Sequence, residues 1–139
     1  MRVDAAFWRG RRVFLTGHTG FKGSWLTLML GMLGAKTTGY SLPAPTDPAM
    51  FELLGLASSL DHRIGDIRDL GAMEAAMCAA EPEIVLHLAA QPLVRASYVD
   101  PVDNFATNVM GTVNLLDACR RAPSVKTIVV ITTDKCYEN

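Results

Sequence analysis

Cysteine is scarce in this chain, and its spacing argues against a structural zinc site. The sequence has three cysteines, Cys78, Cys119 and Cys136, which are far apart and odd in number. None of them forms a Cys-x-x-Cys pair, which is the spacing most typical of zinc ligands. Reduced thiols are the simplest interpretation, and they are typical of a cytoplasmic protein.

The sequence also lacks an excess of either charge and a long apolar segment. The formal net charge is −1, with Lys and Arg dispersed, which argues against a nucleic-acid or membrane-surface partner. The most apolar run covers residues 24–33 and is too short to span a bilayer. Because it follows a predicted strand and a glycine turn, it is also unlike a signal peptide. Half of the 139 residues are hydrophobic, which is enough for one packed domain.

What the sequence does contain is an alternation of strand and helix patterns. Short β-rich runs predict strands at 11–17, 36–42, 60–66, 83–90 and 125–133. Apolar spacing and helix-start residues predict helices at 21–33, 49–55, 69–80 and 101–121. Strands that alternate with helices form a parallel sheet covered on both faces. We therefore expect a doubly wound α/β fold of the Rossmann type, with strand order 3-2-1-4-5, that stops after the fifth strand.

Two of the predicted helices carry additional signals. Residues 21–33 repeat apolar side chains at helical spacing, namely Trp25, Leu26, Met29, Leu30 and Leu33. Asp100 followed by Pro101 is typical of a helix start. Because a doubly wound sheet normally continues beyond its fifth strand, we expect residues 1–139 to be an incomplete domain from the front part of a longer protein.

The first strand runs into a glycine-rich turn, GHTGFKGS, at residues 17–24. A nucleoside-triphosphate loop requires Gly before Lys, whereas here Lys22 precedes Gly23. The dinucleotide turn fits better, because Gly17 ends a strand, Gly20 lets the backbone approach a pyrophosphate, and Gly23 allows tight packing of the following helix. The start of that helix offers free N–H groups and a positive dipole end. The alternative is a tight turn that binds no ligand.

The ends of the second and third strands bear on the cofactor. Ser41 occupies the position where an acid usually binds the adenosine ribose, and no nearby Arg marks a 2′-phosphate. The turn itself therefore leaves NAD and NADP open. Asp66 ends the third strand, where it is suited to bind the adenine amine. Its alternative role is a helix cap, for which Asp69 competes.

Ligands of such sheets lie beyond the carboxyl ends of the strands, and three loops end there, at 16–22, 88–95 and 132–137. In the middle loop, Ala89 and Ala90 let a cofactor pass close to the backbone. Arg95 is suited to a diphosphate or a sugar, and its alternative is a solvated surface residue. His87, which precedes this loop in an apolar strand, fits a core histidine bonded to backbone better than a catalyst.

The last loop places Thr133, Asp134 and Lys135 side by side after the fifth strand. An acid and a base at one site are suited to moving protons. The alternative is a loop held by a salt bridge.

Several segments together resemble the CDP-glucose 4,6-dehydratases, a family of extended short-chain dehydrogenases/reductases of nucleotide-sugar metabolism. The segments are GHTGFKGSWL, GYSL, GDIRD, HLAAQPLVRASY, TNVMGTVNLL and TTDKCYEN, and the resemblance runs from about Trp8 to Asn139. The glycine turn and the Ala-Ala pair mark the superfamily, whereas QPLVRASY and TDKCYEN are more specific. The resemblance implies that residues 1–139 form an NAD-binding Rossmann domain without the substrate-binding region.

The resemblance also implies a reaction. Enzymes of this family oxidise C4 of the sugar in CDP-glucose with NAD, eliminate water across C5 and C6, and return the hydride to C6. Carried over by position, Asp134 protonates the leaving C6 hydroxyl and Thr133 bonds the C4 oxygen. Lys135 stands where dTDP-glucose dehydratases have a glutamate base. An amine accepts a proton only when its pKa is lowered by burial or nearby positive charge.

Further site residues follow from the same resemblance. It implies that the cofactor is bound by Gly17, Gly20, Phe21, Lys22, Gly23, Ser41, Asp66, Ile67, Leu88, Ala89, Ala90 and Thr107. It implies that Gln91 and Arg95 bind the sugar nucleotide. Relatives form homodimers through the helix at 101–121 and the following one, so we expect a homodimer of the full-length protein.

The chain departs from the family in one respect. The Tyr-x-x-x-Lys pair that starts the redox cycle follows the fifth strand in the family, and this sequence has no such motif. We therefore expect the 139-residue chain alone to have no dehydratase activity. Two other interpretations remain open at this point: a non-catalytic dinucleotide-binding module, and another sugar-nucleotide epimerase, dehydratase or reductase of the superfamily.

Overall fold

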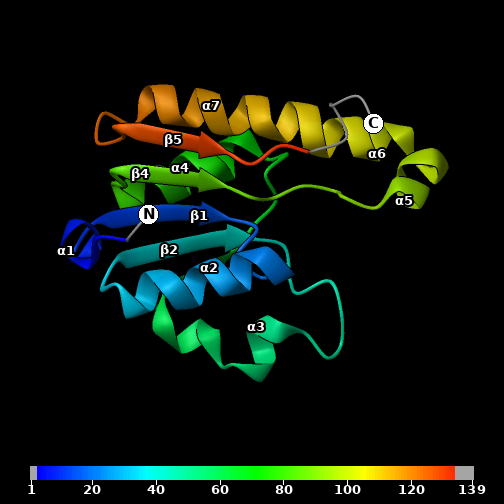
Figure 1. Ribbon diagram of the computed structural model, residues 1–139. Coiled ribbons are helices and arrows are strands. Elements are labelled where there is room, and N and C mark those ends of the chain that lie inside the picture. Colours follow the sequence, from blue (N-terminus) through cyan, green and yellow to red (C-terminus); the bar gives the residue numbers. More distant parts are fainter. Residues whose placement is uncertain (1–2, 134–139) are drawn as a thin grey trace.

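The protein forms a five-stranded parallel sheet in the order β3-β2-β1-β4-β5 (Figure 1). The computed structural model describes residues 3–133. The strands are β1 Arg12–Thr16, β2 Lys36–Ser41, β3 Asp61–Ile64, β4 Ile84–His87 and β5 Thr127–Val130. The predicted doubly wound topology is confirmed.

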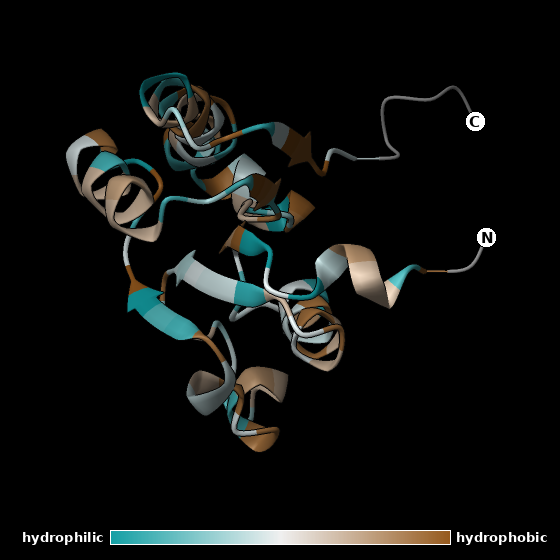
Figure 2. Cartoon of the chain, turned by 90° about the vertical axis from the view of Figure 1, so that its left-hand side faces the viewer, coloured by the Kyte–Doolittle hydropathy of each residue, from teal (hydrophilic) through white to brown (hydrophobic). Residues whose placement is uncertain are grey.

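Helices cover the sheet on both sides, as seen along the strands in Figure 2. They are α1 Ala5–Trp8, α2 Phe21–Met32, α3 Met50–Leu53, η1 Leu56–Ser59, α4 Leu70–Ala80, α5 Val94–Val99, α6 Pro101–Phe105, η2 Ala106–Met110 and α7 Gly111–Arg121. Helices α4 and α7 bury a large cluster on one face, which includes Phe14, Met73 and Leu115. Helix α2 buries a smaller one on the other face, with Val13, Leu15 and Leu30. Each cluster excludes water from the apolar side chains of a strand and a helix, which stabilises the layers.

The helix starts expected at Asp69 and Asp100 are present, and a glycine ends α2. Asp69 accepts a hydrogen bond from the Ala72 amide at the start of α4. Asp100 does the same for the Asp103 amide at the start of α6, with Pro101 as the first helical residue. Gly34, just after α2, has the left-handed φ of 77° that favours glycine.

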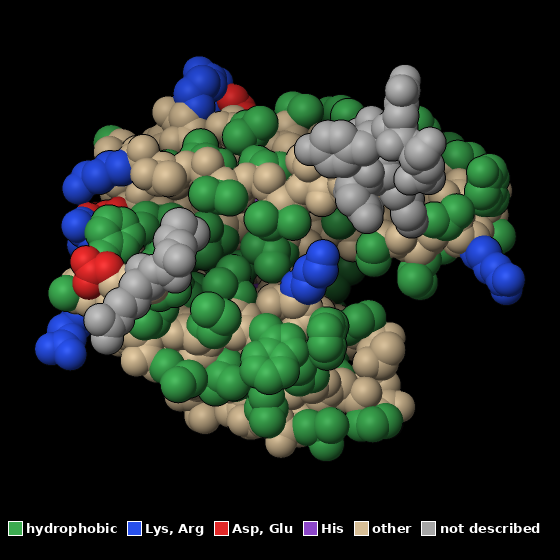
Figure 3. Space-filling model, viewed as in Figure 1, with side chains coloured by type: hydrophobic (Ala, Val, Ile, Leu, Met, Phe, Trp, Pro, Cys, Tyr) green, Lys and Arg blue, Asp and Glu red, His purple; other side chains and the backbone are tan. Residues whose placement is uncertain are grey.

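Three features differ from the sequence expectation. The predicted loop at 88–95 leads into helix α5, so Arg95 lies in a helix. The predicted single helix at 101–121 is interrupted by η2, a π-helical turn in which the hydrogen bonds skip one more residue. Helix α2 turns Trp25 and Met29 towards solvent, and hydrophobic side chains gather over it in Figure 3.

The buried side of α2 is made instead of Gly23, Ser24, Thr27 and Leu30. Three of these residues are small, which lets the helix approach the glycine turn closely. The hydroxyl of Thr27 donates to the Gly23 carbonyl at 2.9 Å, so its burial leaves no unpaired polar group.

Across residues 3–133, no helix is both long and apolar enough to cross a membrane.

Candidate functional site

The glycine turn between β1 and α2 is fixed by close backbone contacts. Gly17 has a φ of 74°, and its amide donates to the Tyr40 carbonyl at 3.1 Å. A Cβ at Gly17 would lie 2.7 Å from the Ala89 nitrogen, closer than real Cβ contacts allow. Position 17 therefore requires glycine both for its conformation and for its contact with the loop after β4.

The other two glycines of the turn differ in the space around them. A Cβ at Gly20 would meet only the Gly17 carbonyl oxygen, at 3.4 Å. A Cβ at Gly23 would lie 2.0 Å from that same oxygen and 2.7 Å from the His18 Cα. The predicted tight packing at Gly23 is therefore present, although its partner is the turn itself rather than a strand. Gly20 borders open space, which would allow a ligand to approach the backbone closely.

The start of α2 has the properties of an anion site. Its first residue follows Gly20, which has no capping side chain, and the first turn contains no acidic residue. Phe21 and Lys22 are exposed on this turn. Uncapped N–H groups and the positive end of the helix dipole attract a pyrophosphate.

At the end of β2, Ser41 is bonded to the glycine turn. Its hydroxyl lies 2.8 Å from that of Thr19, which also donates to the Leu42 carbonyl at 2.9 Å. Because the Thr19 proton goes to Leu42, Ser41 donates in the shared bond, and both side chains are buried. The contact of Ser41 with a cofactor ribose stays a prediction.

At the end of β3, Asp66 is bonded to Arg68. The carboxylate accepts from the Arg68 amide at 2.9 Å and from its guanidinium. These side-chain hydrogen bonds lower the pKa of Asp66 below its usual range, so it is ionised at neutral pH. Since Asp69 caps α4, the alternative role of Asp66 as a helix cap does not apply. Arg68 also pairs with Asp103 of α6 and so connects the β3 end to that helix.

Ile67, next to Asp66, is buried against α7. A Cβ at Gly111 would lie 2.5 Å from the Ile67 Cδ1 atom, so a larger residue at position 111 would force the Ile67 side chain to shift. The Asn114 side chain donates to the Ile67 and Arg68 carbonyls at 3.0 Å and 2.9 Å. Helix α7 therefore fixes the position of Asp66 and Ile67, the segment predicted to bind adenine.

The loop after β4 is bonded to η2. The Asn108 side chain accepts from the Gln91 amide at 2.8 Å and donates to its carbonyl at 3.0 Å. The Gln91 side chain donates to Leu93 and Asn104 and accepts from the Leu93 amide. Leu88 and Ala89 are half-buried and Ala90 is exposed.

Two other residues predicted for the site flank this loop. Thr107 is half-buried on η2, and Arg95 is exposed on α5. Their contacts with ligands stay predictions. Thr133, after β5, is exposed, and Asp134 and Lys135 lie outside the described residues. The roles of Asp134 as the acid and Lys135 as the base therefore stay predictions.

His87 and His18 occupy the carboxyl edge as buried histidines. His87 bonds to the hydroxyls of Thr16 and Thr112 rather than to backbone, which corrects the expectation from sequence. Burial lowers its pKa.

His18, in the glycine turn, was not singled out from the sequence. Its Nε2 lies 2.6 Å from Nδ1 of His62 on β3. Burial, and then the charge of His62, lower the pKa of His18 to about 4, with a smaller opposing effect from the Tyr40 backbone. The only indication in the sequence was the presence of a histidine, His18, within the glycine turn.

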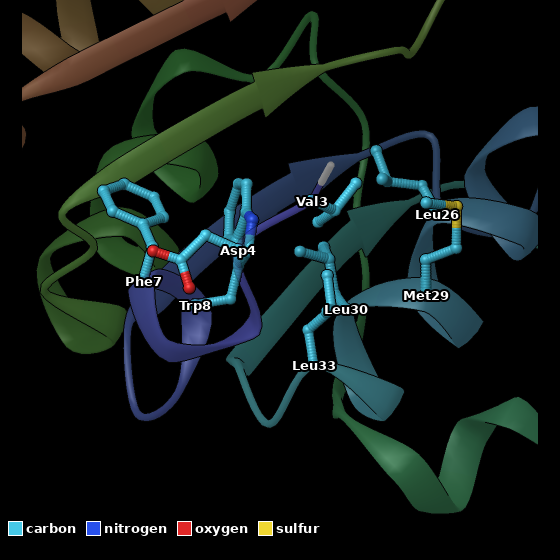
Figure 4. Close-up of a pocket in the computed structure, with 8 residues that line it drawn as sticks. All are labelled: Val3, Asp4, Phe7, Trp8, Leu26, Met29, Leu30 and Leu33. Atoms are coloured by element: carbon cyan, nitrogen blue, oxygen red, sulfur yellow. The ribbon is translucent and has the colours of Figure 1, made fainter. Parts of the chain in front are cut away.

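A hollow of about 330 Å³ lies between α1 and α2 and is lined almost entirely by apolar side chains, including Phe7, Trp8 and Leu30 (Figure 4). Helix α1 lies at the opposite end of the strands from the glycine turn (Figure 1). This hollow is therefore separate from the predicted cofactor site.

Several known proteins with similar sequences are named as sugar-nucleotide dehydratases or epimerases. The family model for GDP-mannose 4,6 dehydratase matches residues 14–138. CDP-glucose 4,6-dehydratase of Salmonella typhimurium is 52% identical over 137 residues, which are 99% of this chain and 38% of that protein. UDP-N-acetylglucosamine 4,6-dehydratase (inverting) of Campylobacter jejuni is 29% identical over 91% of this chain and 37% of that protein. The chain thus spans less than two-fifths of the length of either relative.

Solved structures of epimerases have the same fold. UDP-glucose-4-epimerase from Stenotrophomonas maltophila, with bound NAD and formylated UDP-arabinopyranose, matches with a TM-score of 0.77 and 28% identity over 90% of this chain and 38% of that one. UDP-glucose 4-epimerase of Thermus thermophilus, in complex with NAD, matches with a TM-score of 0.73 and 32% identity over 84% of this chain and 36% of that one. Since the family model covers the sheet, the glycine turn and the loops at its carboxyl edge, this chain belongs to the GDP-mannose 4,6 dehydratase family.

Proposed function

We propose that this chain is the dinucleotide-binding part of an enzyme that converts CDP-glucose into CDP-4-dehydro-6-deoxyglucose. The observation that carries the proposal is its 52% identity with the Salmonella CDP-glucose 4,6-dehydratase over 99% of the chain. Relatives named for UDP- or dTDP-sugars share 28–31% with it in the same region. That contrast favours CDP-glucose as the substrate.

The carboxyl edge fits NAD as the cofactor. The open space beside Gly20 and the uncapped start of α2 suit a pyrophosphate, and two solved epimerases of the same fold hold NAD. The residues proposed to hold it are Gly17, Gly20, Phe21, Lys22, Gly23, Ser41, Asp66, Ile67, Leu88, Ala89, Ala90 and Thr107. When bound, NAD would accept a hydride from the sugar and later return it.

Other residues of the chain are proposed to orient the sugar nucleotide and to transfer protons. We propose that Thr133 orients the C4 oxygen of the sugar, Asp134 protonates the leaving C6 hydroxyl, and Lys135 takes the C5 proton. Arg95 is exposed and suited to the charged diphosphate of the substrate. The amide group of Gln91 already bonds Leu93 and Asn104, so its main contribution is to shape the loop beside the sugar.

Cofactor binding is tested on this chain by comparing two glycine variants. Gly20→Val fills the open space and should abolish measurable NAD binding in calorimetry while leaving the thermal midpoint nearly unchanged. Gly23→Val collides with the Gly17 carbonyl and should lower stability by about 3 kcal/mol, at the upper end of overpacking costs. If Gly20→Val binds NAD as the unmodified chain does, the turn has only a structural role.

The reaction is tested in a longer enzyme that joins this chain to a Tyr-x-x-x-Lys segment. CDP-glucose should be converted to the 4-keto product, and UDP- or dTDP-glucose should be poor substrates. Asp134→Asn should keep NAD affinity and slow loss of the C6 hydroxyl by roughly 10²–10⁴-fold, as expected when a general acid is removed. Release of a C4 epimer instead of the 4-keto-6-deoxy product would refute the proposal.

A further inference from the structure

The buried ring of His87 joins three elements at the carboxyl edge. Its side chain ends β4 and is 3% exposed. Nδ1 lies 2.6 Å from the hydroxyl of Thr16, the last residue of β1, and Nε2 lies 3.1 Å from the hydroxyl of Thr112 in α7. Both ring nitrogens are therefore bonded, each to a side chain that is distant in sequence.

The directions of these bonds fix the position of the ring proton. The Thr112 hydroxyl donates its single proton to the Asn108 carbonyl at 2.8 Å, so towards Nε2 it accepts. The Thr16 oxygen accepts from the Leu88 and Ala89 amides at 3.2 Å each, so its own proton points to Nδ1. A hydroxyl has one donor and two acceptor positions. The Thr16 hydroxyl uses all three, and the single donor position of Thr112 is taken by the Asn108 carbonyl. His87 is consequently neutral, with its proton on Nε2.

The same bonds set the position of the loop that follows β4. Thr16 holds the Leu88 and Ala89 amides, and Ala89 lies against Gly17 of the glycine turn. Farther along the loop, Asn108 brackets Gln91 through both of its backbone groups. The segment between these two anchors is the one proposed to line the cofactor.

We propose that His87 is a positioning residue which, through Thr16 and Thr112, sets the spacing between the glycine turn and the Leu88–Ala90 wall of the dinucleotide site. The predicted effect of His87 on NAD affinity rests on the proposed NAD-binding function, whereas the hydrogen-bond geometry does not. His87 does not act as an acid or base, since neither of its nitrogens is free to bind a substrate.

The first test concerns geometry and needs no cofactor. Nitrogen-15 NMR of the His87 ring should show the proton on Nε2. In His87→Leu the Thr16 hydroxyl loses its acceptor, and the Ala89 amide should exchange with solvent about tenfold faster, as expected for a weakened buried hydrogen bond. The Gly39 amide in β2 is the internal reference. A proton on Nδ1, or unchanged exchange at Ala89, would overturn the proposal.

The second test separates positioning from stability. Val85→Ala, in the core of β4, is the matched control, because it destabilises the same strand and leaves the hydrogen bonds of His87 in place. His87→Leu should weaken NAD binding about tenfold more than Val85→Ala. His87→Gln should recover part of that loss, since its amide can donate to Thr112, and Thr112→Ser should bind NAD normally.

Equal NAD affinity in His87→Leu and Val85→Ala would reduce His87 to a core residue and refute the inference. Failure of the unmodified chain to bind NAD would instead refute the proposed function, and the NMR and exchange results would still decide the geometry of the loop.

Discussion

On either side of β1 the carboxyl edge of the sheet contains one buried histidine, and the two are held in different ways. His87 has a hydroxyl at each ring nitrogen. His18 has one nitrogen bonded to His62 and the other, Nδ1, without a hydrogen-bond partner among the described residues. Its ring lies instead against Phe51 and over Gly39.

The difference shows two means of fixing the same residue type. On the β4 side, hydrogen bonds at both ring nitrogens hold His87, so its position depends on the individual donor and acceptor atoms. Close packing holds the β2–β3 side, so its geometry is sensitive to volume and to charge.

The largest effect is expected where packing holds the ring. In Gly39→Ala the new Cβ would lie 2.5 Å from the His18 Cγ atom. Since the ring is fully buried, it cannot move aside, and stability to urea should fall by about 3 kcal/mol.

Two further variants sharpen that result. Gly31→Ala in α2 has no neighbour within 4 Å and should stabilise the helix slightly. Adding His18→Ala to Gly39→Ala should restore more than about 1 kcal/mol relative to additivity, because the clashing ring is removed. Additive effects would show that His18 and Gly39 are not in contact.

A medium effect is expected from pH. The pKa of His18 is lowered to about 4 in the folded state, whereas the unfolded chain has a value near ~6.5. Between these values the unfolded state binds more protons, so stability rises with pH in this window and is lost as pH falls. From pH 6.5 to 4.5 the histidine should remove about 2 kcal/mol of unfolding free energy.

The variant His18→Leu isolates this contribution. Urea unfolding at both pH values should show a pH dependence that is smaller by that amount in the variant, since carboxylates titrate in both proteins. An identical pH dependence in the two proteins would mean that His18 is protonated as easily in the folded chain as in the unfolded one.

The smallest effect is expected at the link between the two sides. Arg68 bonds Asp66 after β3 and Asp103 in α6, and all three side chains are partly exposed. Exposed ion pairs contribute little, so Arg68→Gln should cost less than about 1 kcal/mol. The pKa of Asp66, followed by NMR, should rise because its main hydrogen-bond donor is gone. A loss of stability comparable to that of Gly39→Ala would mean that the two sides fold as one unit.

Much of the fold was predictable because its signals are local. The apolar runs that form β1 and β4 are each only a few residues long, and the three glycines of the turn all lie between residues 17 and 23. Helix α5 was missed because it has six residues and no side chain that caps its start. The inward face of α2 was predicted only in part, at Gly23 and Leu30. The burial of Ser24 was missed, because contacts with the turn bury it and not its own hydrophobicity.

The histidine contacts were beyond local patterns. His18 and His62 are 44 residues apart, and nothing in either segment indicates that they meet. His87 was recognised as a core residue, yet its partners Thr16 and Thr112 lie 71 and 25 residues away. Only the strand order brings these groups together, so the sequence indicated the residue type and not its bonds.

The central position of β1 has a consequence for the order in which the chain assembles. Contact between Thr19 and Ser41 closes 22 residues, whereas contact between Thr16 and His87 closes 71. Because the entropy lost on closing a loop grows with the logarithm of its length, the second closure costs about 1 kcal/mol more. The glycine turn and β2 are therefore the easier unit to form first, and the wall opposite them is added when β4 arrives. The cofactor site proposed between them depends on this longer closure, so we expect it to form late in folding rather than as the nucleus.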